Sequence, residues 1–191
     1  MLTHEQHGPA TMVFAGTSDN ASPGLDGLFP DSLDTVERPV TCSADKSELI
    51  EELTAQIGTH DEAHSLLGQK AALMLDEMLE NALYAAPRSG DGSPLFPERK
   101  PRILQEGESI LLRYRFDGRQ LVLEVRDSWG TLTQSRVFSY LAVNASEEEP
   151  DPERAGRGLF FMWQLFDQFY VRIYPGRETV VGGSLLLMSD K

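Results

Sequence analysis

Asp117 and Gly118 separate two runs of strand-forming residues, and this arrangement constrains the fold more than any other feature of the 191-residue chain. The runs span residues 109–116 and 120–126 and are rich in aliphatic and aromatic side chains. An Asp-Gly pair between such runs favours a tight turn with positive φ angles, which predicts an antiparallel hairpin. The hairpin buries apolar side chains only if a second layer covers it.

The covering layer is predicted to be helical. Apolar residues recur at helical spacing from residue 63 to residue 85, which indicates a long helix that ends before Pro87. Thr59 and Glu62 are predicted to cap its start. Shorter helices are expected over 46–57, 133–143 and 159–169, and further strands over 36–42, 170–174 and 184–188. The predicted fold class is α+β: a two-layer α/β sandwich with a mixed, mostly antiparallel sheet and helices on one face.

Residues 1–35 differ in composition from the rest of the chain. They are rich in Gly, Pro, Ser, Asp and Asn, and within them only residues 11–15 are strand-like. This composition predicts a flexible or loosely docked N-terminal tail, followed by one domain over residues 36–191.

The balance of charge narrows the choice of partners. The chain has 17 Lys and Arg against 30 Asp and Glu, a net charge of -13. Such a surface repels phosphate backbones and anionic lipids, so nucleic acid and membranes are not expected as partners, and protein surfaces are. Cys42 is the single cysteine, and the sequence shows neither a membrane-span-length apolar run nor a signal peptide, so a cytoplasmic location is expected.

The first candidate for chemistry is the pair Glu77 and Asn81 on the long predicted helix. Side chains four residues apart lie one turn from each other on the same face, here the apolar one. A carboxylate and an amide on a buried face need polar partners, and a metal ion bound to a phosphate would supply them. The alternative is a solvated helix edge, or a structural Asn that caps a neighbouring loop.

Two further candidates follow along the chain. Asp127 ends a predicted strand, where its carboxylate can accept a hydrogen bond from an exocyclic amine such as that of adenine. The alternative is an ordinary Asp turn. Gly156 and Gly158 open a predicted helix whose free N–H groups suit a phosphate, and Arg154 or Arg157 can add charge-assisted contacts. The alternative is a flexible loop with a glycine at a helix start.

The order and spacing of these features resemble the GHKL superfamily of ATP-binding domains, which have the Bergerat fold. Glu77 to Ala82 looks like the N box of that superfamily, Asp127 to Gly130 like its G1 box, and Arg154 to Leu159 like its G2 box. Gly182-Gly183-Ser184 is similar to its last glycine box. Within the superfamily, the sequence 153–159 resembles the bacterial anti-sigma-factor serine/threonine kinases, in which an Arg precedes Gly-x-Gly.

The resemblance implies a role for each candidate residue. Glu77 would be the general base, and Asn81 would hold Mg²⁺ on the phosphates of ATP. Asp127 would bind the adenine, with Trp129 and Gly130 beside it. The glycines, Arg157 and Leu159 would surround the phosphates, and Arg154 would stabilise the transferring phosphoryl group. The implied partners are a sigma factor or analogous target, a STAS-domain antagonist and a second copy of the chain.

One residue departs from the family pattern and leaves a second function open. The usual G1 box is Asp-x-Gly-x-Gly, whereas Trp129 stands at the first of these glycine positions. Its indole can stack on the base, wall the pocket or fill it. The alternative function is therefore a degenerate binding module of the same fold that does not use ATP. A plain ATPase is a third reading, less favoured because no transducer domain follows.

Overall fold

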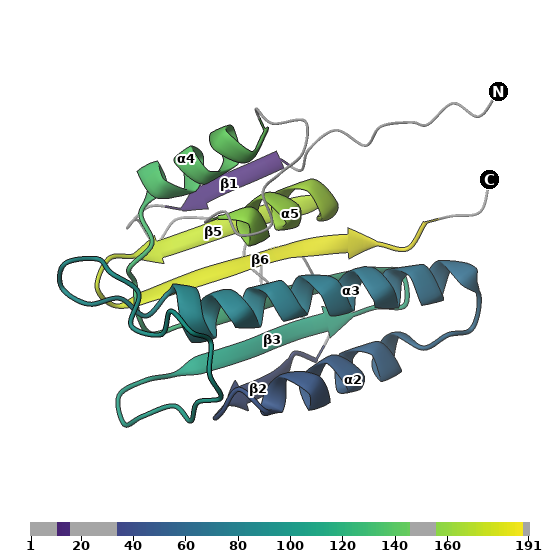
Figure 1. Ribbon diagram of the computed structural model, residues 1–191. Helices are drawn as coiled ribbons and strands as arrows, with labels where there is room; N and C mark the ends of the chain where they lie inside the picture. Colours follow the sequence, from purple (N-terminus) through teal and green to yellow (C-terminus); the bar gives the residue numbers. More distant parts are fainter. Residues whose placement is uncertain (1–10, 16–33, 146–155, 189–191) are drawn as a thin grey trace.

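A computed structural model describes residues 11–15, 34–145 and 156–188 of the chain (Figure 1). The strands are β1 (Thr11–Ala15), β2 (Val36–Val40), β3 (Ile110–Phe116), β4 (Gln120–Asp127), β5 (Gln168–Tyr174) and β6 (Glu178–Leu186). The helices are α2 (Asp45–Ile57), α3 (Glu62–Glu80), the π-helical segment η1 (Asn81–Ala85), α4 (Gln134–Ala145) and α5 (Arg157–Leu165).

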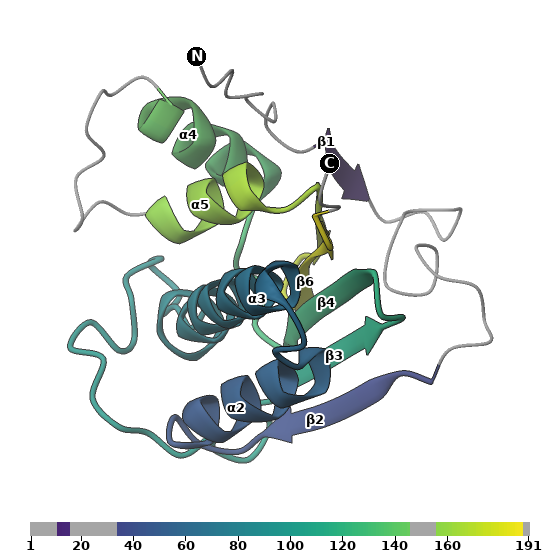
Figure 2. The ribbon, with the colours of Figure 1, turned by 90° about the vertical axis from the view of Figure 1, so that its right-hand side faces the viewer.

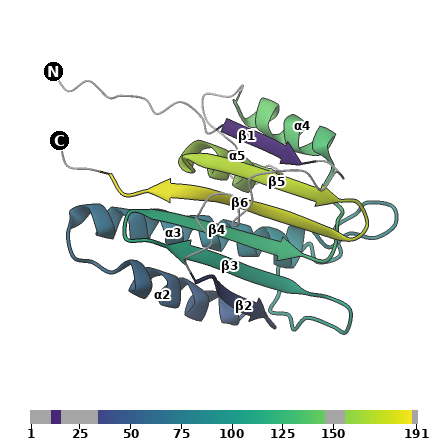
Figure 3. The ribbon, with the colours of Figure 1, turned by 180° about the vertical axis from the view of Figure 1, so that it is seen from behind.

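The strands form a single six-stranded sheet in the order β1-β5-β6-β4-β3-β2 (Figure 3). Every neighbouring pair is antiparallel except β1 with β5, which is parallel. The predicted hairpin is confirmed as β3–β4, and the carboxylate of Asp117 accepts hydrogen bonds from the backbone of Arg119 and Gln120 in its turn. The sheet is therefore mixed and mostly antiparallel, as the sequence predicts.

The helices lie on one face of this sheet, which makes the molecule a two-layer α/β sandwich (Figure 2). Side chains alternate between the two faces of a strand, so the odd-numbered residues of β4 face the helices together. They pack in a core with the apolar faces of α2, α3 and α5. The core members from these elements include Leu53, Ile57, Ala71, Met74, Met78, Leu121, Leu123, Val125 and Met162.

The other face of the sheet carries a buried ionic cluster. Glu124 of β4 is fully buried and accepts hydrogen bonds from Arg113 at 2.7 Å, Tyr170 at 2.8 Å and Arg172 at 3.0 Å. These partners come from β3 and β5, so the cluster ties strands on either side of β4 and β6 together. A buried carboxylate is tolerated because it is paired in this way.

Several local predictions are wrong in detail. The cap of α3 is Asp61, whose side chain accepts the backbone N–H of His64, rather than Thr59 with Glu62. The last predicted helix ends at Leu165, because the following residues continue into β5. Residues 11–15 of the predicted tail are indeed strand-like and form an edge strand of the sheet. The remainder of residues 1–33 lies outside the described residues.

The predicted start of the last strand, at Ser184 after the two glycines, is also wrong. Gly182 and Gly183 lie inside β6, a strand that begins six residues before Ser184. A Cβ on Gly182 would meet the hydroxyl of Tyr170, and one on Gly183 would meet the ring of Phe166. The absence of side chains at these glycines makes room for the ring of Phe166 in the core and for the ring of Tyr170 on the other face of the sheet. Among the described residues, no helix is long and apolar enough to span a membrane.

Candidate functional site

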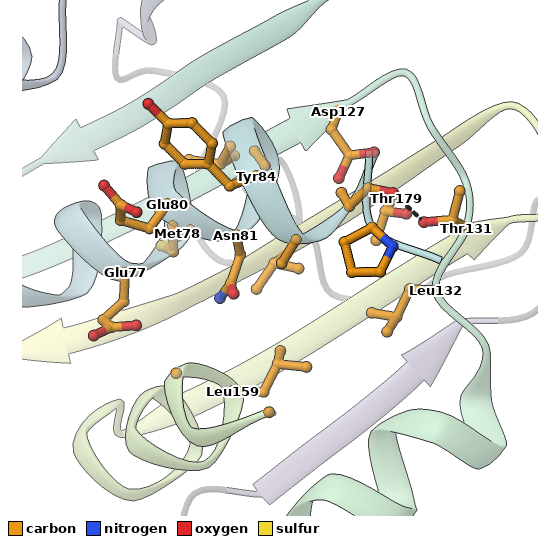
Figure 4. A pocket seen from close by; sticks show the side chains of 18 of the residues that line it. Glu77, Met78, Glu80, Asn81, Tyr84, Asp127, Thr131, Leu132, Leu159 and Thr179 are labelled. Atoms are coloured by element: carbon orange, nitrogen blue, oxygen red, sulfur yellow. Dashed lines mark hydrogen bonds between the residues drawn. The ribbon is translucent and has the colours of Figure 1, made fainter. Parts of the chain in front are cut away.

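A pocket of about 740 Å³ lies between the C-terminal half of α3, the start of α5 and the sheet (Figure 4). That volume is within the range of pockets that bind small molecules and cofactors. Most of the predicted site residues line it: Glu77, Asn81, Asp127, Gly156, Arg157, Gly158 and Leu159. The structure therefore brings together three sequence segments that were singled out independently.

Glu77 of α3 and Asn81 of η1 point toward the first turn of α5 (Figure 4). Gly158 is the point of closest approach: a Cβ there would overlap Oε2 of Glu77 and lie 3.1 Å from Nδ2 of Asn81. This Asn81 nitrogen is buried and has no hydrogen-bond partner among the described residues. A buried amide without a partner is costly in a folded protein, and such a group is typical of a place that receives a ligand.

The start of α5 faces the same end of the pocket. Gly156 is its N-cap, in a left-handed conformation with φ of 84°, and its Cα lies against the ring of Tyr140. The first hydrogen bond of the helix runs from the N–H of Phe160 to the carbonyl of Gly156 at 3.1 Å. The N–H groups of residues 157–159 precede it and have no acceptor within the helix. They form the positive end of the helix dipole, which favours an anion.

The environment raises the pKa of Glu77. Burial is the largest cause and the negative charge of Asp76 adds to it, while the nearby positive charges of Arg157 and Arg99 oppose it. A carboxyl group whose pKa is raised above its ordinary value is a better proton acceptor, which suits a general base. Perturbed carboxyl groups in a pocket are typical of functional sites.

Asp127 and Thr179 lie at the other end of the pocket (Figure 4). They are direct cross-strand partners on β4 and β6, and the strand period turns both toward the helices. Asp127 is 5% exposed, and burial raises the pKa of its carboxyl to about 6 despite hydrogen bonds from backbone N–H groups. The hydroxyl of Thr179 is buried without a partner among the described residues. Together they offer an acceptor and a hydroxyl to a polar heterocycle.

Trp129 does not line the pocket. Its indole N–H donates a hydrogen bond of 3.1 Å to the carbonyl of Ala82, and its backbone N–H donates to Oδ1 of Asp127 at 2.9 Å. Gly130 is also placed away from the lining: with φ of 56°, its Cα packs against the backbone of the turn between β5 and β6. The indole therefore leaves the pocket open rather than filling it.

The pocket lining is rich in arginine, although the chain as a whole is acidic. Among the described residues, four arginines line it, Arg88, Arg99, Arg136 and Arg157. Two of them come from the loop that follows α3 and η1, and Arg99 of that loop lies 3.5 Å from the Glu80 carboxylate. Three carboxylates, Glu77, Glu80 and Asp127, line the same pocket, so the arginines leave a small excess of positive charge there, which favours an anionic ligand.

One predicted site residue falls outside the described part of the chain, and several residues that line the pocket were not predicted from the sequence. Arg154 lies outside the described residues. Thr179, Tyr140 and the loop arginines Arg88 and Arg99 line the pocket although the sequence did not single them out. The run Thr179-Val180-Val181 carries a strand signal in its β-branched residues, and an unbroken strand there would have placed Thr179 beside Asp127.

Comparison with known proteins adds no family to this picture. No protein-family model matches the chain, and no curated protein is significantly similar to it in sequence.

Proposed function

We propose that this protein is an ATP-binding domain of the GHKL type that acts as a protein serine/threonine kinase in partner-switching regulation. The observation that carries the proposal is the convergence of Glu77, Asn81 and the α5 N-terminus on one end of a 740 Å³ pocket, with Asp127 and Thr179 at the other end. The pocket thus has one end suited to phosphates and one suited to a base.

The phosphate end is supported by charge and by free donors. Arg157 and the free N–H groups of the first turn of α5 face the pocket there. The close approach of Gly158 to Glu77 leaves no room for a side chain, so backbone N–H groups reach the pocket directly. Backbone donors and a guanidinium are the groups that stabilise charge on a transferring phosphoryl group.

The base end is supported by Asp127 and Thr179. An ionised carboxylate accepts a hydrogen bond from an exocyclic amine, and the Thr179 hydroxyl can donate to a ring nitrogen. The apolar side chains of Val125, Leu159 and Met162 also line the pocket, and such side chains pack well against a flat heterocycle. Adenine fits this combination of one acceptor, one hydroxyl and an apolar wall.

The residues present fit Mg²⁺ that is held mainly by phosphate oxygens. Asn81 is the side chain that would bind it, through its amide oxygen, while its buried Nδ2, which has no partner among the described residues, can donate to a phosphate oxygen. No cluster of three or more His, Cys, Asp or Glu suited to a metal occurs among the described residues. Mg²⁺ in nucleotide sites commonly takes one or two protein oxygens and completes its shell with phosphates and water, and bound there it would neutralise phosphate charge.

Glu77 has the central role in the proposed reaction. Its carboxylate accepts the proton of a serine or threonine hydroxyl of the protein substrate, as that oxygen forms a bond to the terminal phosphorus of ATP. The bond between that phosphorus and the oxygen of ADP breaks, and the products are a phosphoprotein and ADP. Arg157 stabilises the charge that develops on the transferring group, with Arg154 as the proposed second cation.

The protein partners remain part of the proposal. By the same resemblance, they are a sigma factor or analogous target and a STAS-domain antagonist that receives the phosphate, and the kinase would act as a cytoplasmic homodimer. The alternative function is a binding module of the same fold that does not turn over ATP. It is favoured by the position of Gly130, which packs on a neighbouring turn rather than against the pocket.

The proposal is tested by calorimetric titration with Mg-ATP, followed by phosphotransfer assays with the Glu77→Gln variant. The variant keeps the shape of the side chain and one acceptor oxygen, so nucleotide affinity should change less than about threefold. Phosphotransfer should fall by about 100-fold or more, because the proton acceptor is lost. Wild-type protein that does not bind Mg-ATP would exclude the kinase, and equal turnover by the variant would remove Glu77 from the reaction.

A further inference from the structure

The π-helical segment η1, which follows α3, carries two backbone carbonyls that no backbone N–H of the helix bonds. Residues 81–85 form a π-helical turn, in which the N–H of Ala86 bonds to the carbonyl of Asn81 at 2.8 Å. The next N–H along the chain would be that of residue 87, but Pro87 has none. Pro87 stands at the position of the π-helical partner of Ala82 and of the α-helical partner of Leu83, so neither carbonyl finds that partner.

Side chains from outside the helix take these two carbonyls. The indole N–H of Trp129 bonds to Ala82 at 3.1 Å, and the guanidinium of Arg102 bonds to Leu83 at 2.6 Å. The same guanidinium also bonds to Glu108 and lies 5.6 Å from the centre of the Trp129 ring. Side chains from other parts of the chain thus hold the helix end.

The turn that contains Trp129 also fixes the base end of the pocket. The backbone N–H of Trp129 donates to Oδ1 of Asp127 at 2.9 Å. Thr131, two residues further on, donates from its hydroxyl to the carbonyl of Ala86 at 2.5 Å. One short segment, residues 127–131, is therefore bonded at two points to the helix end that begins with Asn81.

We propose that Trp129 is a positioning residue that couples the base end of the pocket to the phosphate end through the Ala82 carbonyl. The inference rests on the proposed nucleotide function. The backbone of Trp129 orients the Asp127 carboxylate, while its indole holds the π-helical turn and so sets the Asn81 amide one residue before Ala82. The tryptophan at the usual glycine position therefore supports the π-helical turn and does not obstruct the pocket.

The Trp129→Phe variant separates the two roles. It removes the indole N–H and keeps the backbone N–H that bonds to Asp127, so the base end stays intact. By calorimetry, affinity for adenosine should stay within about twofold of wild type, whereas affinity for Mg-ATP should fall on the order of tenfold, as expected for the loss of one partly buried hydrogen bond. Exchange of the Ala86 amide hydrogen should accelerate by a similar factor.

The same substitution at the other tryptophan, Trp163→Phe on α5, is the matched control and should leave both affinities and the exchange rate within about twofold of wild type. Equal losses of adenosine and Mg-ATP affinity in Trp129→Phe would indicate general loosening and overturn the coupling, as would no change in either. If wild-type protein binds neither ligand, the nucleotide function fails by itself. Amide exchange then still decides whether Trp129 holds the helix end.

Discussion

Gly158 lies so close to Glu77 that a methyl group on its Cα would overlap Oε2 of the carboxylate. The contact joins the first turn of α5 to the last turns of α3, and it sets the width of the pocket at its phosphate end. Since the φ of Gly158 is not in the left-handed region, this glycine is required by space and not by backbone conformation.

The Gly158→Ala variant should therefore lose function and keep its fold. Alanine favours a helix by roughly 0.5–1 kcal/mol over glycine, so thermal stability should be unchanged or higher. Its methyl group displaces the Glu77 carboxylate, and a misplaced catalytic group typically lowers turnover by about 100-fold. The measurements are thermal unfolding and phosphotransfer. Gly68→Ala on α3, where a Cβ meets nothing within 4 Å, is the control that should alter neither binding nor turnover.

Removal of the Asn81 side chain should separate a ligand role from a structural one. The amide nitrogen is buried without a partner among the described residues, so Asn81→Ala should leave the free energy of unfolding equal to wild type or higher. Affinity for Mg-ATP should fall about tenfold or more, while affinity for ATP in EDTA should be unchanged. An equal loss of affinity in EDTA would contradict a role in holding Mg²⁺.

Asp127 gives the protein a defined dependence on pH. Burial raises the pKa of its carboxyl from 3.8 to about 6 in the folded state, so the folded protein holds a proton that the unfolded chain has released. The contribution of Asp127 to the free energy of unfolding should therefore be greatest below pH 4. About 3 kcal/mol of unfolding free energy should be lost as the pH rises from about 4 to above 6.

Asp127→Asn does not ionise and should be more stable than wild type above pH 6, with the difference shrinking toward pH 4. Urea unfolding at several pH values measures it, and parallel pH profiles for the two proteins would exclude the raised pKa. In the wild type, nucleotide affinity should increase as the pH rises through about 6, because only the ionised carboxylate is a pure acceptor for the base amine.

The buried cluster on the far face of the sheet should act on stability alone. Glu124→Ala removes the carboxylate that Arg113 and Arg172 share, and loss of one partner of a buried pair costs about 3–5 kcal/mol. Glu37→Ala is the matched control, since Glu37 pairs with the same Arg113 but is 53% exposed in its side chain and should cost less than about 1 kcal/mol. Denaturant unfolding compares the two. Similar losses of unfolding free energy in the two variants would show that burial does not determine how much these ion pairs stabilise the fold.

The features predicted well from sequence are those that depend on local pattern. The hairpin at Asp117-Gly118 and the helical spacing that leads to Glu77 and Asn81 are read directly from neighbouring residues. The face on which Asp127 lies follows from strand period once β4 is placed. These local signals were enough for the fold class and for most of the predicted site residues to lie in one pocket.

The features that were missed depend on contacts between distant segments. Gly182 and Gly183 look like a break in a strand, although they lie inside β6 because Tyr170 and Phe166 occupy the space above them. That misreading hid Thr179. The position of the Trp129 indole depends on the backbone carbonyl of Ala82, 47 residues earlier, which has no backbone partner. No pattern of neighbouring residues in the sequence indicates such a carbonyl.

The parallel pairing of β1 with β5 has a consequence for folding. Thr11 is placed opposite Gln168, so β1 can pair only after a segment far along the chain has formed its strand. Contacts between such distant segments form late and slow folding. Until then the outer edge of β5 presents open hydrogen-bonding groups to any extended chain nearby, and pairing with β1 covers them.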